Sequence, residues 1–266
     1  MTHVKYWMAL CLLPLFFSYY VTSVNAASPP PQVSLIIDDF GGKVKGVEEM
    51  LDLDLPLTIA IMPFMEDSHK QAVLAAEKGH EVMLHLPMEP LKGKASWLGP
   101  GAIRAEMTKE EAKQATQKAI DSLPHVKGLN NHMGSKVVET SEAISGVLEA
   151  AKENQLYVID SGTNPRSLIP ELCESMGIPY EVRDVFLDDT LSSAAEVRQQ
   201  MKHMAQRTES DAKTIAIGHV GIKGEETVTG IKEGLSFLKS TGTEIVPASR
   251  LTLSNLSRNP FSFWEY

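Results

Sequence analysis

The stretch VSLIIDDFGG, from Val33 to Gly42, joins a short apolar run to two adjacent aspartates and two glycines. A nearly continuous apolar run of this kind is typical of a strand that is covered on both faces, as the strands of parallel sheets are. Asp38 and Asp39 follow directly after the run, where the chain must leave the sheet. The stretch therefore predicts a buried parallel strand that carries two carboxylates to one edge of the sheet.

The same pattern recurs along the chain, because short apolar runs alternate with amphipathic stretches between residues 33 and 250. The runs that predict strands are Val33–Ile37, Leu57–Met62, Glu81–Leu86, Gly128–Asn131, Leu156–Ile159, Val182–Leu187, Thr214–Ile217 and Glu244–Val246. A strand followed by a helix, repeated about eight times, indicates a (β/α) barrel or a near relative. We therefore predict the α/β fold class, with about seven or eight strands in a single domain.

Two helix starts can be placed from the sequence. Thr108 precedes Glu111, and Ser193 precedes Glu196, with the three-residue spacing of a capping box. In a capping box, the hydroxyl and the carboxylate each accept from a backbone N–H that the first turn of a helix leaves unpaired. We therefore expect helices to begin immediately after Thr108 and Ser193.

The first residues have the layout of a secretory signal peptide. Lys5 precedes an uncharged apolar run from Trp7 to Val21, and small residues lead up to Ala26. The run is shorter than the roughly 20 residues of a membrane-spanning helix, so an uncleaved anchor is the less favoured alternative. The expected organisation is a signal peptide at residues 1–26, cleaved near Ala26, a Pro-rich linker at 27–32, a barrel domain at 33–250 and a C-terminal tail at 251–266.

Composition restricts the compartment and the partners. The formal net charge of −9 makes nucleic acid or an anionic membrane a poor partner. Of the two cysteines, Cys11 lies in the leader and Cys173 remains, so the exported protein would have no internal disulfide. No segment after the leader is apolar enough to cross a bilayer. We expect a periplasmic protein that is held together by its core.

Polar residues follow most of the predicted strands. They are Asp38 and Asp39, His85 with Glu89 just beyond, Asn130, Asn131 and His132, Asp160, Asp188 and Asp189, and His219. In a (β/α) barrel, the site is built where the strands end. An aspartate there can simply cap the next helix, which is the reading we favour for Asp188 and Asp189. Capping does not explain three histidines at one rim, so the pattern favours a metal or catalytic site.

The adjacent carboxylates of Asp38 and Asp39 are the strongest single signal. Neighbouring carboxylates repel each other unless a cation or a shared proton relieves them. Gly41 and Gly42 allow the backbone to turn sharply and a ligand to approach. One aspartate could therefore bind a metal while its neighbour remains free as a base.

Three motifs resemble those of the polysaccharide deacetylases, carbohydrate esterase family four. LIIDDFGG, at residues 35–42, resembles the family's T-F-D-D-G signature. GHEVMLHLPMEP, at residues 79–90, resembles the second motif, G-H-E-x-x-x-H-x-x-x-H-P. TIAIGHVG, at residues 214–221, resembles the late motif of two hydrophobic residues, any residue and a histidine. Across residues 33–250 the chain looks like the divergent polysaccharide deacetylase group, in which these motifs are altered.

This resemblance implies a distorted (β/α) barrel that binds one divalent metal ion, with zinc expected. Carried over to the matching positions, it implies that Asp38 is the general base and His219 the general acid. Asp39 and His85 would be metal ligands. We further expect Asp160 to orient His219, as carboxylates do in catalytic triads.

The third metal ligand stays open, because this chain departs from the family's pattern. Glu89 stands where the family has its second metal-binding histidine, and NNHMGS at residues 130–135 replaces an Arg-Pro-Pro-Tyr-Gly-like motif. Either Glu89 ligates the metal, or His132 completes the set. We favour His132, because two imidazoles are then restored and Glu89 can support the ligands from outside. Pro87 also disfavours a regular helix that would place Glu89 one turn from His85.

The function implied by the resemblance is an exported metal-dependent hydrolase that removes N-acetyl groups from a cell-envelope glycan such as peptidoglycan. The alternative is a catalytically weak or inactive barrel that binds a glycan or a cell-envelope protein. The altered motifs favour this alternative, whereas the retention of Asp38, Asp39 and His219 argues against it. A glycosidase with paired carboxylates is a further rival, but it would leave the histidines without a role.

Overall fold

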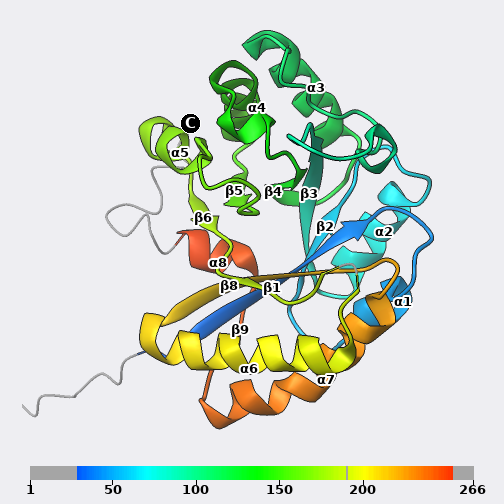
Figure 1. Cartoon of the computed structure of the whole chain (residues 1–266), viewed down its shortest axis with the longest axis vertical. Coiled ribbons are helices and arrows are strands. Elements are labelled where there is room, and N and C mark those ends of the chain that lie inside the picture. The colour runs from blue at the N-terminus through cyan, green and yellow to red at the C-terminus, as the bar shows by residue number, and fades with distance from the viewer. Residues whose placement is uncertain (1–28, 190, 254–266) are drawn as a thin grey trace, which may run out of the picture.

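One parallel sheet dominates the computed structural model, which describes residues 29–189 and 191–253 (Figure 1). Its strands run in the order β6-β5-β4-β3-β2-β1-β8-β7, and β9 pairs with β1 beside this path. Their bounds are β1 (Gln32–Phe40), β2 (Thr58–Ile61), β3 (Glu81–Met88), β4 (Val126–Met133), β5 (Tyr157–Asp160), β6 (Tyr180–Val182), β7 (Val185–Phe186), β8 (Lys213–His219) and β9 (Glu244–Ile245). The order is that of a (β/α) barrel, and among the described residues no pairing joins β6 to β7. The sheet is a curled half-barrel, which confirms the predicted distorted (β/α) barrel.

The opening of the barrel corrects one prediction. The apolar run Val182–Leu187 was expected to form one strand, but it contributes to two, β6 and β7, which pair with β5 and β8. The backbone N–H of Arg183 donates to the carbonyl oxygen of Asp160 in β5. The backbone N–H of Asp184 donates to the carbonyl oxygen of Ile215 in β8, on the opposite side of the opening. The chain therefore crosses the opening of the sheet between these two residues, so no continuous strand can form.

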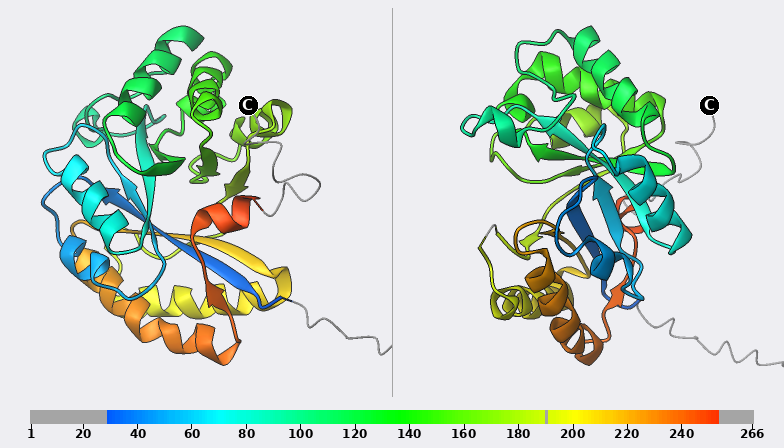
Figure 2. Two further views of the ribbon diagram at one scale, coloured as in Figure 1. Left: turned by 180° about the vertical axis from the view of Figure 1, so that it is seen from behind. Right: turned by 90° about the vertical axis from the view of Figure 1, so that its right-hand side faces the viewer.

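Helices surround the sheet and connect its strands (Figure 2). They are α1 (Val47–Leu51), α2 (Ser68–Glu77), α3 (Lys109–Asp121), α4 (Ser141–Glu153), α5 (Ile169–Met176), α6 (Ala194–Asp211), α7 (Gly224–Ser240) and α8 (Ala248–Leu253), with 3-10 turns η1 (Ala95–Trp97) and η2 (Val137–Glu139). Both predicted capping boxes are present, since the hydroxyls of Thr108 and Ser193 accept from the amides of Glu111 and Glu196. No helix in the described ranges has the length and apolarity needed to cross a bilayer.

The C-terminal helix α8 belongs to the core rather than to a tail. Leu251 and Ala248 are buried with the inward-facing side chains of the sheet, among them Ile36 and Met83. The amide of Ala248 donates to the hydroxyl of Thr58, at the beginning of β2. The predicted tail at 251–266 therefore starts too early, because the first of its residues complete the inner core. The predicted leader at 1–26 and residues 254–266 lie outside the described residues, as do the first two positions of the linker.

Candidate metal centre

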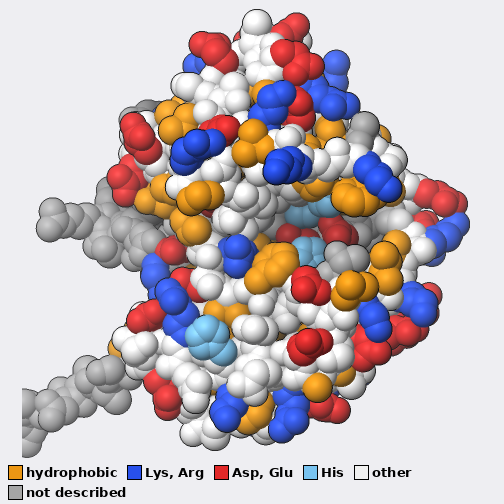
Figure 3. Space-filling model, in the orientation of Figure 1, with side chains coloured by type: hydrophobic (Ala, Val, Ile, Leu, Met, Phe, Trp, Pro, Cys, Tyr) orange, Lys and Arg blue, Asp and Glu red, His pale blue; other side chains and the backbone are white. Residues whose placement is uncertain are grey.

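The rim at the carboxyl ends of the strands gathers most of the predicted site residues. Asp38 lies opposite His219 in the β1–β8 register, and His85 lies opposite Asn130 in the β3–β4 register. Because parallel strands end at the same edge, these pairs bring four strands of the barrel to one place. Figure 3 shows a hollow in this face, with histidine and acidic side chains inside it and hydrophobic side chains along its border.

A break in the strand geometry lets both aspartates face the site. Successive side chains of a regular strand point to opposite faces of the sheet. Asp39 instead adopts a left-handed backbone with φ of 69°, and the pairing with β2 shifts between Ile37 and Phe40. As a result, Asp38 Oδ2 lies 3.7 Å from His85 Nδ1, and Asp39 Oδ1 lies 3.3 Å from His85 Nε2. The His85 imidazole therefore lies between the two carboxylates.

Asp39, His85 and His132 form one compact group that could hold a metal ion. Asp39 Oδ1 is 3.1 Å from His132 Nδ1, and His132 Nδ1 is 3.1 Å from His85 Nε2. Each predicted ligand comes from a different strand, namely β1, β3 and β4. This is the favoured ligand set from the sequence, and the structure brings its three ligand atoms together.

The tautomers of both histidines can be read from their outer partners. His85 Nδ1 lies 2.7 Å from Asn130 Oδ1, and the amide orientation of Asn130 follows from its Nδ2, which donates to Asp38 Oδ1 at 2.8 Å. His132 Nε2 lies 3.0 Å from the Trp97 carbonyl, which can only accept. Each of these ring nitrogens is therefore a donor, and in the neutral imidazoles the opposite nitrogens present lone pairs to Asp39.

This arrangement of acceptors fits a divalent cation. Within the described part of the chain, Asp39 Oδ1 is one of few buried side-chain oxygens without a hydrogen-bond donor in suitable geometry. It meets two imidazole lone pairs at little more than 3 Å, which is repulsive unless a proton or a cation lies between them. Tetrahedral zinc with bonds of about 2.0–2.1 Å places neighbouring ligand atoms roughly 3.3–3.4 Å apart, close to the separations seen here. The residues present fit a metal of this size.

The charges of the group are strongly coupled. Burial raises the pKa of Asp39, but His132 and His85 outweigh it and hold that pKa well below its usual value. Burial lowers the pKa of His85, but Asp38 and Asp39 raise it above its ordinary value. Burial also raises the pKa of Asp38, although His85 and His219 oppose this shift. Asp39 is thus kept as a carboxylate, while Asp38 is a stronger base than an exposed aspartate.

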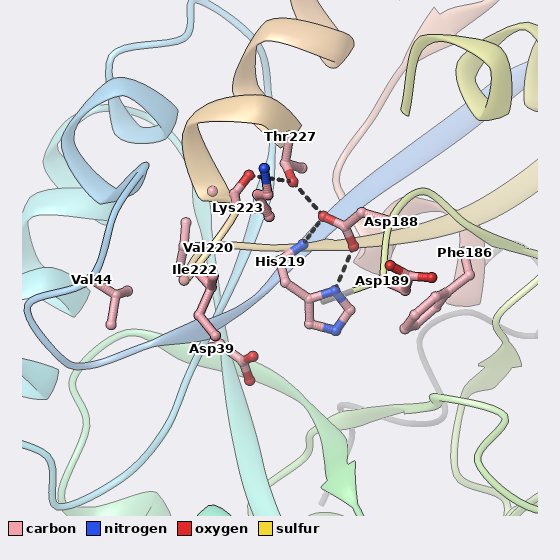
Figure 4. A pocket seen from close by; sticks show the side chains of 12 residues that line it. Asp39, Val44, Phe186, Asp188, Asp189, His219, Val220, Ile222, Lys223 and Thr227 are labelled. Atoms are coloured by element: carbon pink, nitrogen blue, oxygen red, sulfur yellow. Dashed lines mark hydrogen bonds and ion pairs between the residues drawn. The ribbon is translucent and has the colours of Figure 1, made fainter. Parts of the chain in front are cut away.

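His219 lines a pocket of about 380 Å³ together with Asp39, and Phe186, Val44 and Ile222 add apolar walls (Figure 4). Its Nδ1 lies 2.7 Å from Asp188 Oδ1. Burial lowers the pKa of His219, but the bond to Asp188 and the nearby Asp39 and Asp38 raise it to about 9. At neutral pH the imidazole therefore carries a proton that it can give up.

The partner of His219 differs from the predicted one. Asp160 was expected to orient this histidine, but its carboxylate accepts from the Gly162 amide in its own loop. Asp188 takes the role instead, because β7 pairs with β8 and brings the end of one strand beside the other. Its second oxygen accepts from the His219 amide and from the Thr227 hydroxyl. The expected cap of the next helix is also absent from Asp188, since Ser193 caps α6.

Glu89 forms its contacts outside the group of potential metal ligands. Its carboxylate accepts from the Ala105 amide at 2.9 Å and pairs with Lys136 at 2.6 Å. It is not among the residues that the structure groups as potential metal ligands in the described ranges. The less favoured ligand set, with Glu89 in place of His132, therefore does not match the geometry.

Two residues of the site were not predicted from the sequence to belong to it. Asn130 connects Asp38 to His85, and its place at the end of an apolar run, two residues before His132, was the available signal in the sequence. Asp188 was visible as one of two aspartates at a strand end, but its neighbour Asp189 forms the turn there by accepting from the Leu191 amide. A strand-end aspartate pair can thus combine a structural and a functional carboxylate.

Fold and site together define a curled parallel α/β barrel with an Asp-His-His group at its rim and an Asp-His pair across the pocket. A family model for the divergent polysaccharide deacetylases matches residues 35–252, and the chain belongs to this family. It is 31% identical over 188 residues to the uncharacterized protein YibQ of Escherichia coli (strain K12), a match that covers 71% of this chain. The match spans 58% of the length of YibQ.

Solved structures share the fold at low sequence identity. The uncharacterized protein ATU2773 from Agrobacterium tumefaciens C58 superposes with a TM-score of 0.77 at 18% identity, covering 85% of this chain and 91% of that one. The peptidoglycan N-acetylglucosamine deacetylase Bc1960 superposes with a TM-score of 0.51 at 12% identity, covering 83% of this chain and 87% of that one. These likenesses establish the fold alone.

Proposed function

We propose that this chain is an exported metal-dependent hydrolase that removes N-acetyl groups from a cell-envelope glycan such as peptidoglycan. The observation that carries the proposal is the convergence of one carboxylate oxygen and two imidazole nitrogens on one point, with a protonated His219 lining the same pocket. A binding surface needs neither feature. The family of the chain and the activity of the fold relative Bc1960 support this class of substrate.

Asp39, His85 and His132 would hold the metal. A bound zinc ion supplies Lewis acidity and lowers the pKa of a water molecule to about 7. Asn130 and the Trp97 carbonyl keep the two imidazoles in the tautomers that a metal requires. Asp38 is the general base of the proposal and takes the proton from the attacking water, for which its raised pKa suits it.

His219 completes the proposed reaction as the general acid. An amide nitrogen is a poor leaving group unless it is protonated as the carbon–nitrogen bond breaks. Since Nδ1 of His219 is hydrogen-bonded to Asp188, Nε2 is the nitrogen that can donate a proton to the departing sugar amine. Asp188 holds the ring in this orientation and stabilises its charged form, as the aspartate of a catalytic triad does. One residue, Asp38, thus accepts the proton from water, and another, His219, donates a proton to the leaving amine.

A test of the proposal measures metal and product together. The purified protein should contain close to one equivalent of zinc and should release acetate from N-acetylglucosamine oligosaccharides or peptidoglycan. A chelator should abolish the release, and added zinc should restore it. Asp39→Asn should remove both metal and activity. Stoichiometric zinc without acetate release from any N-acetylated glycan would contradict the assigned reaction.

The second candidate function is glycan binding without turnover. The burial of Asp38, which is 2% exposed and bonded to Asn130, favours it, because a base must reach the water from which it takes a proton. Under this alternative, the purified protein would sediment with insoluble peptidoglycan and would release no acetate. Asp38→Asn would then leave the binding unchanged.

A further inference from the structure

The outer partner of His132 is a backbone carbonyl from a different part of the chain. His132 Nε2 lies 3.0 Å from the carbonyl oxygen of Trp97, which belongs to η1 in the long connection between β3 and α3. His85, by contrast, is oriented by the Asn130 side chain from the neighbouring strand. One ligand of the group is therefore held by the sheet and the other by a loop.

This loop is fastened at its tip. Trp97 itself is 59% exposed, so its indole contributes little to the anchoring. The next residue, Leu98, is 2% exposed, so a buried side chain directly follows the carbonyl beside His132. Ile103 is fully buried a few residues later. The tip thus combines an exposed aromatic ring with a buried leucine directly after it.

The base of the loop is fastened by Glu89. Its amide donates to the Ile103 carbonyl at 2.9 Å, and its carboxylate accepts from the Ala105 amide at 2.9 Å. Its other oxygen pairs with Lys136 at 2.6 Å, on the segment that follows β4 and His132. Glu89 therefore connects the loop before α3 to the segment that follows β4 and His132. It does so without approaching the ligand atoms.

We propose that the loop at residues 90–105 is a positioning element of the metal centre. The Trp97 carbonyl fixes His132 as the tautomer with its proton on Nε2, and Leu98 and Glu89 hold that carbonyl in place. Without this acceptor, the imidazole can place its proton on Nδ1, where it opposes a cation. The affinity of the centre for its metal depends, for this reason, on residues that are not ligands. The inference rests on the proposed metal role of His132.

Four variants separate the backbone of the loop from its side chains. Leu98→Ala releases the carbonyl, whereas Trp97→Ala keeps the carbonyl and removes only the exposed indole. Leu238→Ala, at an equally buried leucine of α7, controls for a general loss of stability. Glu89→Gln removes the charge that pairs with Lys136 but keeps the size of the side chain. Glu89→Gln also tests the proposal independently if the Leu98→Ala variant does not fold.

Two measurements report on the proposal. Zinc affinity is measured by competition with a chromophoric chelator, and the tautomer of His132 is measured by ¹⁵N NMR of the metal-free protein. Leu98→Ala and Glu89→Gln should weaken zinc binding roughly 10- to 100-fold, the usual effect of losing an outer partner. Leu98→Ala should also populate the Nδ1-protonated tautomer. Trp97→Ala and Leu238→Ala should match the wild-type protein in both measurements.

Three results would overturn the inference. Unchanged affinity and tautomer in Leu98→Ala and Glu89→Gln would show that the loop does not position His132. Equal losses in Leu98→Ala and Leu238→Ala would attribute the effect to stability. A wild-type protein that binds no zinc would refute the metal centre together with this inference, whereas the first two results would leave the proposed hydrolase intact.

Discussion

His85 is the residue on which the site depends, because both aspartates reach it from one strand end. Asp38 approaches Nδ1 and Asp39 approaches Nε2, and the left-handed backbone of Asp39 makes this possible. A non-glycine residue held in that conformation costs of order 1–3 kcal/mol, and such residues cluster at functional sites. The strain here has an identifiable consequence, since a regular strand would turn one carboxylate away.

The identity of the third ligand can be tested at single residues. His132→Ala should abolish measurable zinc binding, because it removes one of three protein ligands. Glu89→Gln should retain zinc with the milder loss expected of a supporting residue. Equilibrium dialysis with metal analysis distinguishes the two. The opposite ranking would assign the ligand to Glu89.

The pair of Asp188 and His219 predicts a dependence on pH. In the metal-free protein, Asp188→Asn should lower the pKa of His219 from its value of about 9, because the largest favourable contact is lost. NMR titration of the His219 ring gives the pKa directly. A pKa that stays near 9 in the variant would show that Asp38 and Asp39 are sufficient to raise it.

The same pair contributes to stability in a defined pH range. The folded-state pKa of His219 lies above the value of about 6.5 expected for the unfolded chain. Its contribution is therefore fully present below pH of about 6.5 and is lost as the pH rises through about 9. In urea denaturation, the free energy of unfolding of the wild-type protein should exceed that of Asp188→Asn by a larger margin at pH 6 than at pH 10. A difference that is constant with pH would contradict this linkage.

At the scale of elements, the turn that directly follows Asp38 and Asp39 at the end of β1 is restricted by a glycine. Gly41 has φ of 118°, and a Cβ there would lie 2.9 Å from the Met62 carbonyl oxygen. Its amide donates to the side-chain oxygen of Gln71 at 2.7 Å, which connects the turn to α2. Gly42 has no such restriction, because a Cβ would meet its nearest atom at 3.8 Å.

These neighbouring glycines provide a matched pair of substitutions. Gly41→Ala should destabilise the protein by more than about 1 kcal/mol, because alanine is strained at positive φ and contacts a backbone oxygen. Gly42→Ala should change the free energy of unfolding by less than about 1 kcal/mol. Urea denaturation of both variants checks the prediction. Equal effects would mean that the turn adapts to a side chain.

At the scale of the molecule, the C-terminal helix closes the inner side of the curled sheet. Leu251 is 1% exposed and packs in the same cluster as residues of β1, β2, β3 and β8. Leu251→Ala should therefore cost about 2–5 kcal/mol, the range for a leucine deleted from a core. Thermal or urea denaturation measures this loss. A cost below 1 kcal/mol would mean that α8 is dispensable for the barrel.

Export is a prediction for the whole chain that depends on residues outside the described ranges. If the leader at residues 1–26 is cleaved, the protein recovered from a periplasmic extract should begin near Ala27. Mass spectrometry of the intact protein gives this N-terminus. Full-length protein in the membrane fraction would instead support the uncleaved anchor.

Local sequence patterns were sufficient for the barrel and for most of the candidate site. A continuous apolar run reports its own burial, and the residue at its end must lie at the rim whatever its neighbours are. Most of the strands, though not the split of Val182–Leu187 into two, and the positions of Asp39, His85, His132 and His219 at the rim could be predicted for this reason. The capping boxes of α3 and α6 are equally local, since they join residues three apart.

The tertiary structure alone decided which of these residues meet. Asp188 rather than Asp160 contacts His219, Asn130 rather than a charged residue orients His85, and a loop carbonyl holds His132. Each contact joins residues at least 31 positions apart. The first two contacts are set by strand register and by the opening between β6 and β7, and the third by the path of the loop between β3 and α3. No local pattern carries that information, because the energy of a register is summed over every strand that shares it.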